Sequence, residues 1–123
     1  MIGSALIWCG VALFGGLGAI ARFELDGLVQ RRSGSEFPLG TLVVNGLGSL
    51  LLGLLIGLHR AESDLLLAGV ATLGSFTTFS TWMLETQRLA EDGEGGLALA
   101  NVVGSIALGL TAAGIGWAIG AAL

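Results

Sequence analysis

Four long runs without a charged residue are the feature that most constrains the fold of this chain. They cover residues 2–21, 37–58, 65–84 and 97–123. A helix of about 20 apolar residues crosses the hydrocarbon core of a bilayer, so each run is long enough to span one. Charged residues make up 11% of the chain, against about 25% in a typical soluble domain. The sequence therefore predicts an all-α, multi-pass membrane protein with one domain over residues 1–123.

Short connections join the four predicted membrane spans, which cover about residues 2–22, 38–59, 65–88 and 97–122. The longest connection, residues 23–36, is polar and carries Arg31 and Arg32, which is typical of a solvated loop. This arrangement leaves no room for a soluble catalytic domain. The sequence also contains no pattern typical of a nucleophile, an acid–base pair or a metal-ligand cluster. Neither an enzyme nor a nucleic-acid partner is expected.

The third run carries five hydroxyl side chains close together. They are Ser75, Thr77, Thr78, Ser80 and Thr81. At about 100° per residue, they point around most of a helix rather than along one stripe. Two structures accommodate them: the hydroxyls donate to carbonyl groups one turn earlier, or the helix opens near Gly74 and its freed backbone groups face protein or water. Broken transmembrane helices of the second kind hold ions in transporters.

Asn45 lies well inside the second run, where an unpaired amide is costly. It begins a polar-to-small stripe at four-residue spacing: Asn45, Ser49, Gly53 and Gly57. Such a stripe favours close packing against another helix, and a similar series begins at Asn101 in the fourth run. Two roles are open for Asn45. Either it bonds another helix and holds the bundle together, or its NH₂ group lines a pathway and donates to an anion.

Arg22, at the end of the first run, also has two interpretations. Its side chain extends to the membrane interface as an ordinary arginine, or it holds a positive charge at the mouth of an anion path. In the third span, Phe79 and Trp82 are three residues apart and therefore lie roughly on one face. Aromatic ring edges are positive, so such an edge can meet an anion where water is absent.

Motifs in a fixed order cover nearly the whole chain. They are Gly15-Gly16-x-Gly18-Ala19-x-x-Arg22-Phe23, Pro38-x-Gly40-Thr41-x-x-Val44-Asn45-x-x-Gly48, Gly74-x-x-Thr77-Thr78-Phe79-Ser80-Thr81 followed by Glu85, and Gly104-Ser105. In this order, in a four-span chain of about this length, they resemble the Fluc/CrcB family of small fluoride channels.

The resemblance implies passive export of fluoride across the cytoplasmic membrane by an antiparallel dimer, with two pores along the subunit interface. It also implies a third span broken at its centre, where backbone carbonyls of Gly74 and Thr77 from both subunits hold a structural sodium ion. Carried over by position, the fluoride pathway comprises Arg22, Thr41, Asn45, Phe79, Ser80, Thr81, Trp82 and Ser105. Several neutral donors can replace the water around a small anion without trapping it as a fixed cation would.

Three residues depart from the pattern of the family. Trp82 stands where the family usually has a second Phe; it is bulkier and brings its own N–H donor. Ser75 replaces a common Gly beside the break, and Asn101 occupies a position that varies. Of the three, Trp82 bears directly on the width of the pore.

Two other functions stay open. The arginines are unevenly distributed, with one on the side of the termini and four on the other: Arg60 against Arg22, Arg31, Arg32 and Arg88. This bias favours one orientation, with the termini outside. A biased chain would pair with an oppositely oriented homologue and act as a non-conducting or half-conducting subunit. The second alternative, a small multidrug-type proton-coupled exporter, needs a carboxylate deep in a span, and the span interiors contain none.

Overall fold

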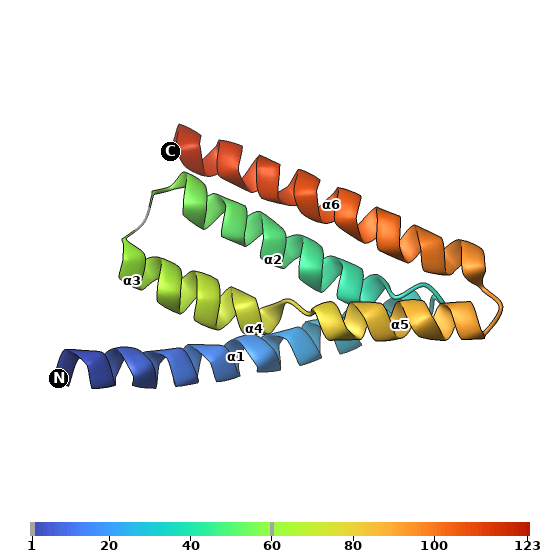
Figure 1. Cartoon of the computed structure of the whole chain (residues 1–123), viewed down its shortest axis with the longest axis horizontal. Coiled ribbons are helices and arrows are strands. Elements are labelled where there is room, and N and C mark those ends of the chain that lie inside the picture. The colour runs from blue at the N-terminus through green and yellow to red at the C-terminus, as the bar shows by residue number, and fades with distance from the viewer. Residues whose placement is uncertain (1, 60) are drawn as a thin grey trace.

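The computed structural model describes residues 2–59 and 61–123, which form an elongated bundle of helices (Figure 1). In chain order the elements are α1 (Ile2–Ser33), α2 (Leu39–Gly57), α3 (Glu62–Asp64), η1 (Leu65–Leu73), α4 (Gly74–Phe76), α5 (Phe79–Glu91) and α6 (Gly95–Ala122). The element η1 is a π-helix, which the sequence did not indicate. The described part of the chain contains no strand.

Four segments are long and apolar enough to cross a membrane, which confirms the prediction of an all-α, multi-pass membrane protein. They are Ile2–Ser33, Leu39–Gly57, Glu62–Glu91 and Gly95–Ala122. Both termini lie at the same end of the bundle (Figure 1). Only 6% of the most apolar window of α1, and 6% of that of α6, is buried within the chain. Both helices therefore keep most of their surface for lipid or for another subunit.

Helix α1 continues through residues that were expected to form a loop. It ends at Ser33, so the prediction of a solvated loop over residues 23–36 was wrong for residues 23–33. Leu25 and Leu28 lie among the polar residues of this stretch and continue the apolar spacing of a helix. The charged residues around Leu25 and Leu28 hide this helical spacing in the sequence.

Gly34 ends helix α1, and the side chain of Gln30 bonds the short connection that follows. Gly34 adopts a left-handed conformation (φ +58°) and its N–H donates to the carbonyl oxygen of Gln30 at 3.1 Å, as expected for a glycine that ends a helix. The side chain of Gln30 then holds the connection to α2. Its Nε2 donates to the Ser35 carbonyl at 2.7 Å, and its Oε1 accepts from the Gly40 N–H at 3.2 Å.

Helices α2 and α6 pack with their backbones in direct contact (Figure 1). A Cβ atom added at Gly53 would overlap the carbonyl of Ala113, and one added at Gly116 would overlap the carbonyl of Leu50. Small residues permit such an approach between helices in a membrane. The prediction that this face of α2 packs against another helix is therefore confirmed.

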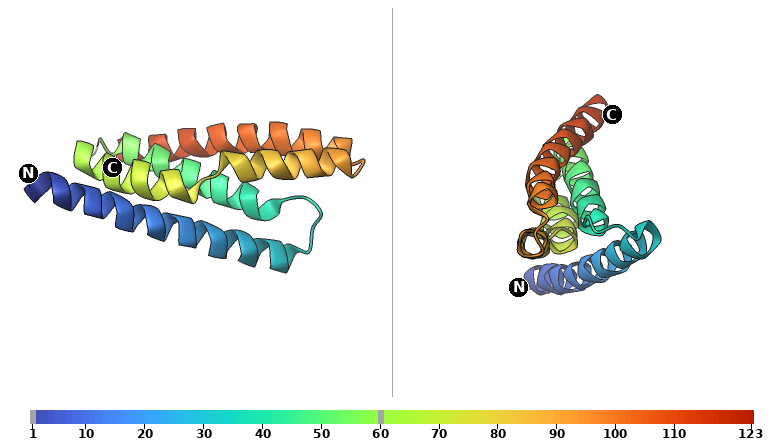
Figure 2. Two further views of the ribbon diagram at one scale, coloured as in Figure 1. Left: turned by 60° about the horizontal axis from the view of Figure 1, so that its bottom comes forward. Right: turned by 90° about the vertical axis from the view of Figure 1, so that its right-hand side faces the viewer.

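Helix α1 lies on the opposite side of the bundle from α6 (Figure 2) and contacts η1, α2 and α4. The glycine motif of α1, at residues 15–19, lies at the contact with the third segment. Gly18 is buried, and an added Cβ there would overlap the carbonyl of Thr72 and the hydroxyl of Ser75. The third segment is thus held between α1 on one side and α2 and α6 on the other.

We expect Gly116→Ala to destabilise the chain, because the added methyl would overlap the Leu50 carbonyl and overpacking costs about 1–3 kcal/mol. Gly114→Ala is the matched control, since an added Cβ there meets no atom within 4 Å. Alanine also favours a helix over glycine by about 1 kcal/mol. Thermal unfolding in detergent should therefore shift down for the first variant and not for the second. Equal melting temperatures would contradict the α2–α6 contact.

Candidate functional site

The third segment is interrupted at Thr77 and Thr78, which confirms the predicted break. Thr77 has φ −81° and ψ 158°, and Thr78 has φ −146° and ψ 125°, so both are extended. The opening lies after Gly74, which is itself part of α4. Helix α5 begins directly after Thr78, whose Oγ1 accepts from the N–H of Thr81 at 3.2 Å, as in an ordinary helix N-cap.

Hydroxyl groups before the break bond back to the preceding turn. Ser75 Oγ donates to the carbonyl of Ala71 at 2.7 Å, and Thr77 Oγ1 donates to that of Leu73 at 2.9 Å. The two structures considered for this segment therefore occur together, since the hydroxyls bond backwards and the helix also opens.

Hydroxyl groups after the break gather around the side chain of Thr78. Its Oγ1 lies 3.1 Å from the hydroxyl of Thr81 and 3.4 Å from that of Ser80. Ser80 is exposed and Thr81 is partly exposed. The start of α5 therefore presents a row of neutral hydroxyls at the surface of the chain.

Asn45 of α2 replaces backbone hydrogen bonds that the break removes. Its Nδ2 donates to the carbonyl of Thr78 at 2.9 Å, and its Oδ1 accepts from the N–H of Thr78 at 2.8 Å. In a continuous helix that N–H would donate to the carbonyl of Gly74. The packing role considered for Asn45 is therefore confirmed. A primary amide has two N–H donors, so the pathway role is compatible with this arrangement.

Two neighbouring cavities meet at Asn45. The first, here called the break hollow, has a volume of about 440 Å³, and its lining includes Asn45, Gly74, Thr77, Thr78, Phe79 and Trp82. The second, the α6 hollow, has a volume of about 360 Å³, and its lining includes Asn45, Ser49, Trp82 and Ser105. Among the described residues that line either hollow, none is charged. Any ion inside would be held by neutral groups only.

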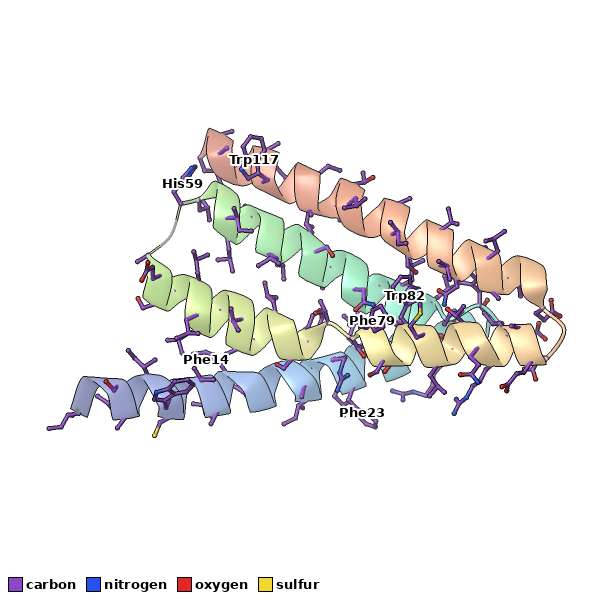
Figure 3. All side chains as sticks on the ribbon, in the orientation of Figure 1. Phe14, Phe23, His59, Phe79, Trp82 and Trp117 are labelled. Carbon is purple, nitrogen blue, oxygen red and sulfur yellow. The ribbon has the colours of Figure 1, made fainter. Side chains whose placement is uncertain are left out.

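Phe79 and Trp82 lie together at the start of α5 (Figure 3). Their ring centroids are 5.5 Å apart and their planes make an angle of 81°, an edge-to-face arrangement. The side chain of Phe79 is 70% exposed. The indole of Trp82 lines both hollows, and its Nε1 donates to the carbonyl of Asn101 at 3.1 Å. Trp82 therefore forms part of the wall that the two hollows share.

The other expected pathway residues lie at varying distances from this centre. Ser105 lines the α6 hollow and donates to Oδ1 of Asn101 at 3.3 Å. Thr41 lies one turn before Asn45 on α2 and is 2% exposed, and its hydroxyl donates to Oε1 of Glu85 at 2.6 Å. Arg22 lies within α1 and lines neither hollow. The proposed position of Arg22 near an entrance therefore stays a prediction.

A comparison with models of protein families identifies the family of this chain. The model of the family described as CrcB-like protein, Camphor Resistance (CrcB), matches residues 9–117. The chain belongs to the CrcB family.

Curated relatives of this CrcB protein are similar over most of their length. A Fluoride-specific ion channel FluC 2 from Mycolicibacterium paratuberculosis is 57% identical over 110 residues, which cover 89% of this chain and 90% of the relative. A Fluoride-specific ion channel FluC 1 from Rubrobacter xylanophilus is 51% identical over 86% of each chain. A Fluoride-specific ion channel FluC from Thermus thermophilus is 47% identical over 92% of this chain and 94% of the relative.

The break of the CrcB chain frees the carbonyl groups of Gly74 and Thr77, which the family resemblance implies as sodium ligands. The donor for Gly74 O in a continuous helix would be the N–H of Thr78, which bonds Asn45 instead. The donor for Thr77 O would be the N–H of Thr81, which bonds the Thr78 hydroxyl instead. Unwound carbonyls of this kind coordinate sodium in broken membrane helices. The described residues contain no cluster of His, Cys, Asp or Glu that could hold a metal.

Sequence reasoning missed two residues of this site. Ser49 lines both hollows, although its place in the small-residue stripe suggested packing alone. Asn101 was noted as the start of a packing series and as a departure from the family pattern, but not as part of the site; it is 1% exposed and contacts Trp82. The available signal was its polar side chain within an apolar run, since a buried amide requires partners.

We expect Asn45→Leu to destabilise the break, because it leaves the N–H and the carbonyl of Thr78 without their partners. Each unpaired buried group costs about 1–3 kcal/mol. Hydrogen exchange at the Thr78 amide should accelerate, and the melting temperature should fall. Ser49→Ala is the matched control, since Ser49 lines the same hollows one turn further along α2. Similar exchange rates at Thr78 in both variants would contradict the role given to Asn45.

Proposed function

We propose that this chain forms a channel that conducts fluoride passively across a membrane. The observation that carries the proposal is the pair of uncharged hollows at the break, lined by the Asn45 amide and by the rings of Phe79 and Trp82. Fluoride is small and strongly hydrated, so it needs several donors in place of water. Neutral donors and positive ring edges supply these without holding the ion as a fixed cation would. The relatives described above are named as fluoride-specific ion channels, which supports fluoride as the ion.

The channel is proposed to be a dimer of two chains in opposite orientations. Phe79, Ser80 and the backbone at Gly74 are exposed on one chain. Exposed polar groups are costly in hydrocarbon, so a second protein surface would cover them. An inverted copy would bring its own break to the same depth in the membrane and complete the pathway on both sides.

A sodium ion between the two breaks is part of the same proposal. The carbonyl oxygens of Gly74 and Thr77 lack their helical donors, and both residues line the break hollow. Two such carbonyls from each chain would surround one cation. The ion would supply positive charge that offsets the repulsion between carbonyl dipoles, and so would hold the two breaks together.

One observation favours a heterodimer as the alternative. Arg31 and Arg32 occupy the last turn of α1, and Arg88 the last turn of α5. Both helix ends lie at the end of the bundle away from the termini (Figure 1). Arg60, which would oppose them, lies outside the described residues. Such a bias favours a single orientation, so an oppositely oriented homologue would be the partner, with this chain as a non-conducting or half-conducting subunit.

The cytoplasmic membrane is the proposed location, because a passive pore there lets fluoride leave the cell. The proton-coupled multidrug exporter considered earlier receives less support. It needs a carboxylate at the substrate site, and neither hollow is lined by a carboxylate among the described residues.

Fluoride efflux from liposomes that contain only this chain tests the proposal, with a fluoride-selective electrode as the detector. Efflux should be fast for fluoride and absent for chloride. Phe79→Ala should slow it by about tenfold or more, the equivalent of roughly 1.4 kcal/mol. Phe23→Ala is the matched control, because Phe23 is similarly exposed (75%) but lies on α1 and lines neither hollow. Equal chloride efflux would contradict the proposed selectivity, and activity of this chain alone would exclude the non-conducting subunit.

Exchange of sodium for N-methyl-D-glucamine at constant ionic strength tests the proposed cation. The purified dimer should melt lower by about 5 °C or more without sodium, because a ligand that binds only the folded state stabilises it. Sodium added back should restore the melting temperature. A melting temperature that does not depend on sodium would contradict the site at Gly74 and Thr77.

A further inference from the structure

The indole N–H of Trp82 does not face the hollows that the ring lines. Its Nε1 donates to the backbone carbonyl of Asn101 on α6 at 3.1 Å, while the ring itself borders the break hollow and the α6 hollow. The direction of this N–H matters for an anion pathway. An indole donor pointing into an uncharged hollow would bond the anion and delay its exit, because conduction requires that each binding step remain weak.

A closed set of hydrogen bonds around Asn101 holds α5 and α6 together at this point. Nδ2 of Asn101 donates to the hydroxyl of Thr86 at 2.8 Å and lies 3.5 Å from the carbonyl of Trp82. The Thr86 hydroxyl in turn donates to the same Trp82 carbonyl at 2.8 Å. Oδ1 of Asn101 accepts from Ser105 at 3.3 Å. These four residues, Asn101, Trp82, Thr86 and Ser105, are called the Asn101 network below.

The Asn101 network holds Trp82 both by its backbone carbonyl and by its indole N–H. Its side-chain bonds hold the backbone of Trp82 on α5, and the backbone carbonyl of Asn101 holds the indole. Asn101 is 1% exposed, so these bonds are formed away from water. Loss of the side-chain bonds leaves the Thr86 hydroxyl and the Trp82 carbonyl without the Asn101 amide. The backbone of Trp82 is then no longer held against α6, and the bond from the indole N–H to the carbonyl of residue 101 weakens.

We propose that Asn101 is a positioning residue that holds the Trp82 indole as a fixed wall between the two hollows and keeps its N–H away from the permeating anion. The proposal rests on the proposed fluoride conduction, and it means that the position of the Trp82 indole affects the rate of that conduction. The ring at position 82 carries an N–H donor, and the Asn101 amide holds the backbone of Trp82 beside the Asn101 carbonyl that accepts from this donor.

The contact itself can be observed without any transport assay. Trp8→Phe and Trp117→Phe, both at exposed positions, leave Trp82 as the only tryptophan. In this background the indole N–H gives a single NMR signal, whose hydrogen exchange reports its bond to the Asn101 carbonyl. Asn101→Leu, of similar size, should accelerate that exchange by about tenfold or more. Thr111→Val is the matched control on α6, because Thr111 is exposed and lies outside both hollows. Unchanged exchange in Asn101→Leu would overturn the proposal.

A double-mutant cycle then separates positioning from general support of the bundle. Asn101→Leu should slow fluoride efflux by about tenfold when residue 82 is Trp, and by less than about twofold when Trp82→Phe is also present, because the second background has no N–H to release. Equal loss in both backgrounds would overturn the proposal, since Asn101 would then act by holding the helices alone. No fluoride efflux from the single-tryptophan chain would overturn the proposed function, whereas faster indole exchange in Asn101→Leu would still support the contact.

Discussion

The pairing of Asn45 with the backbone of Thr78 is the interaction on which the rest of the structure depends. A helix interrupted inside a membrane exposes backbone groups that water cannot reach, and each unpaired group is expensive. Here one amide side chain satisfies both the N–H and the carbonyl of the same residue. The hydroxyl of Thr78 accepts from the N–H of Thr81, which in a continuous helix would donate to the carbonyl of Thr77. The break is therefore maintained by side chains from two segments rather than by flexibility.

The main features of the site follow from the replacement of helical hydrogen bonds by side-chain hydrogen bonds at the break. Because side-chain oxygens take up the N–H groups of Thr78 and Thr81, the carbonyls of Gly74 and Thr77 are released. The same opening starts α5 beside α2, which sets Phe79 next to the Asn45 amide in one hollow. A neutral lining and a pair of free carbonyls thus arise from one local rearrangement, without a charged side chain in either hollow.

Much of this could be predicted from the sequence, because the membrane makes the pattern simple. The uncharged runs determine the four segments, the hydroxyl cluster indicates the break, and the glycine stripe of α2 indicates its contact with α6. The length of α1 was missed, since its charged residues hide the spacing of Leu25 and Leu28. The opening was expected near Gly74 and lies at Thr77 and Thr78, where Asn45 reaches the third segment. The role of Asn101 depends likewise on a partner on another helix, which no local pattern identifies.

The glycine contacts between α2 and α6 have a mechanical consequence. Where two backbones touch, as at Gly53 with Ala113 and at Gly116 with Leu50, no side chains remain between them that could change rotamer. The two backbones therefore form a firm wall that carries Asn45 on one helix and Ser105 on the other. The width of the hollows then depends on the residues that face this wall from the third segment, Phe79 and Trp82.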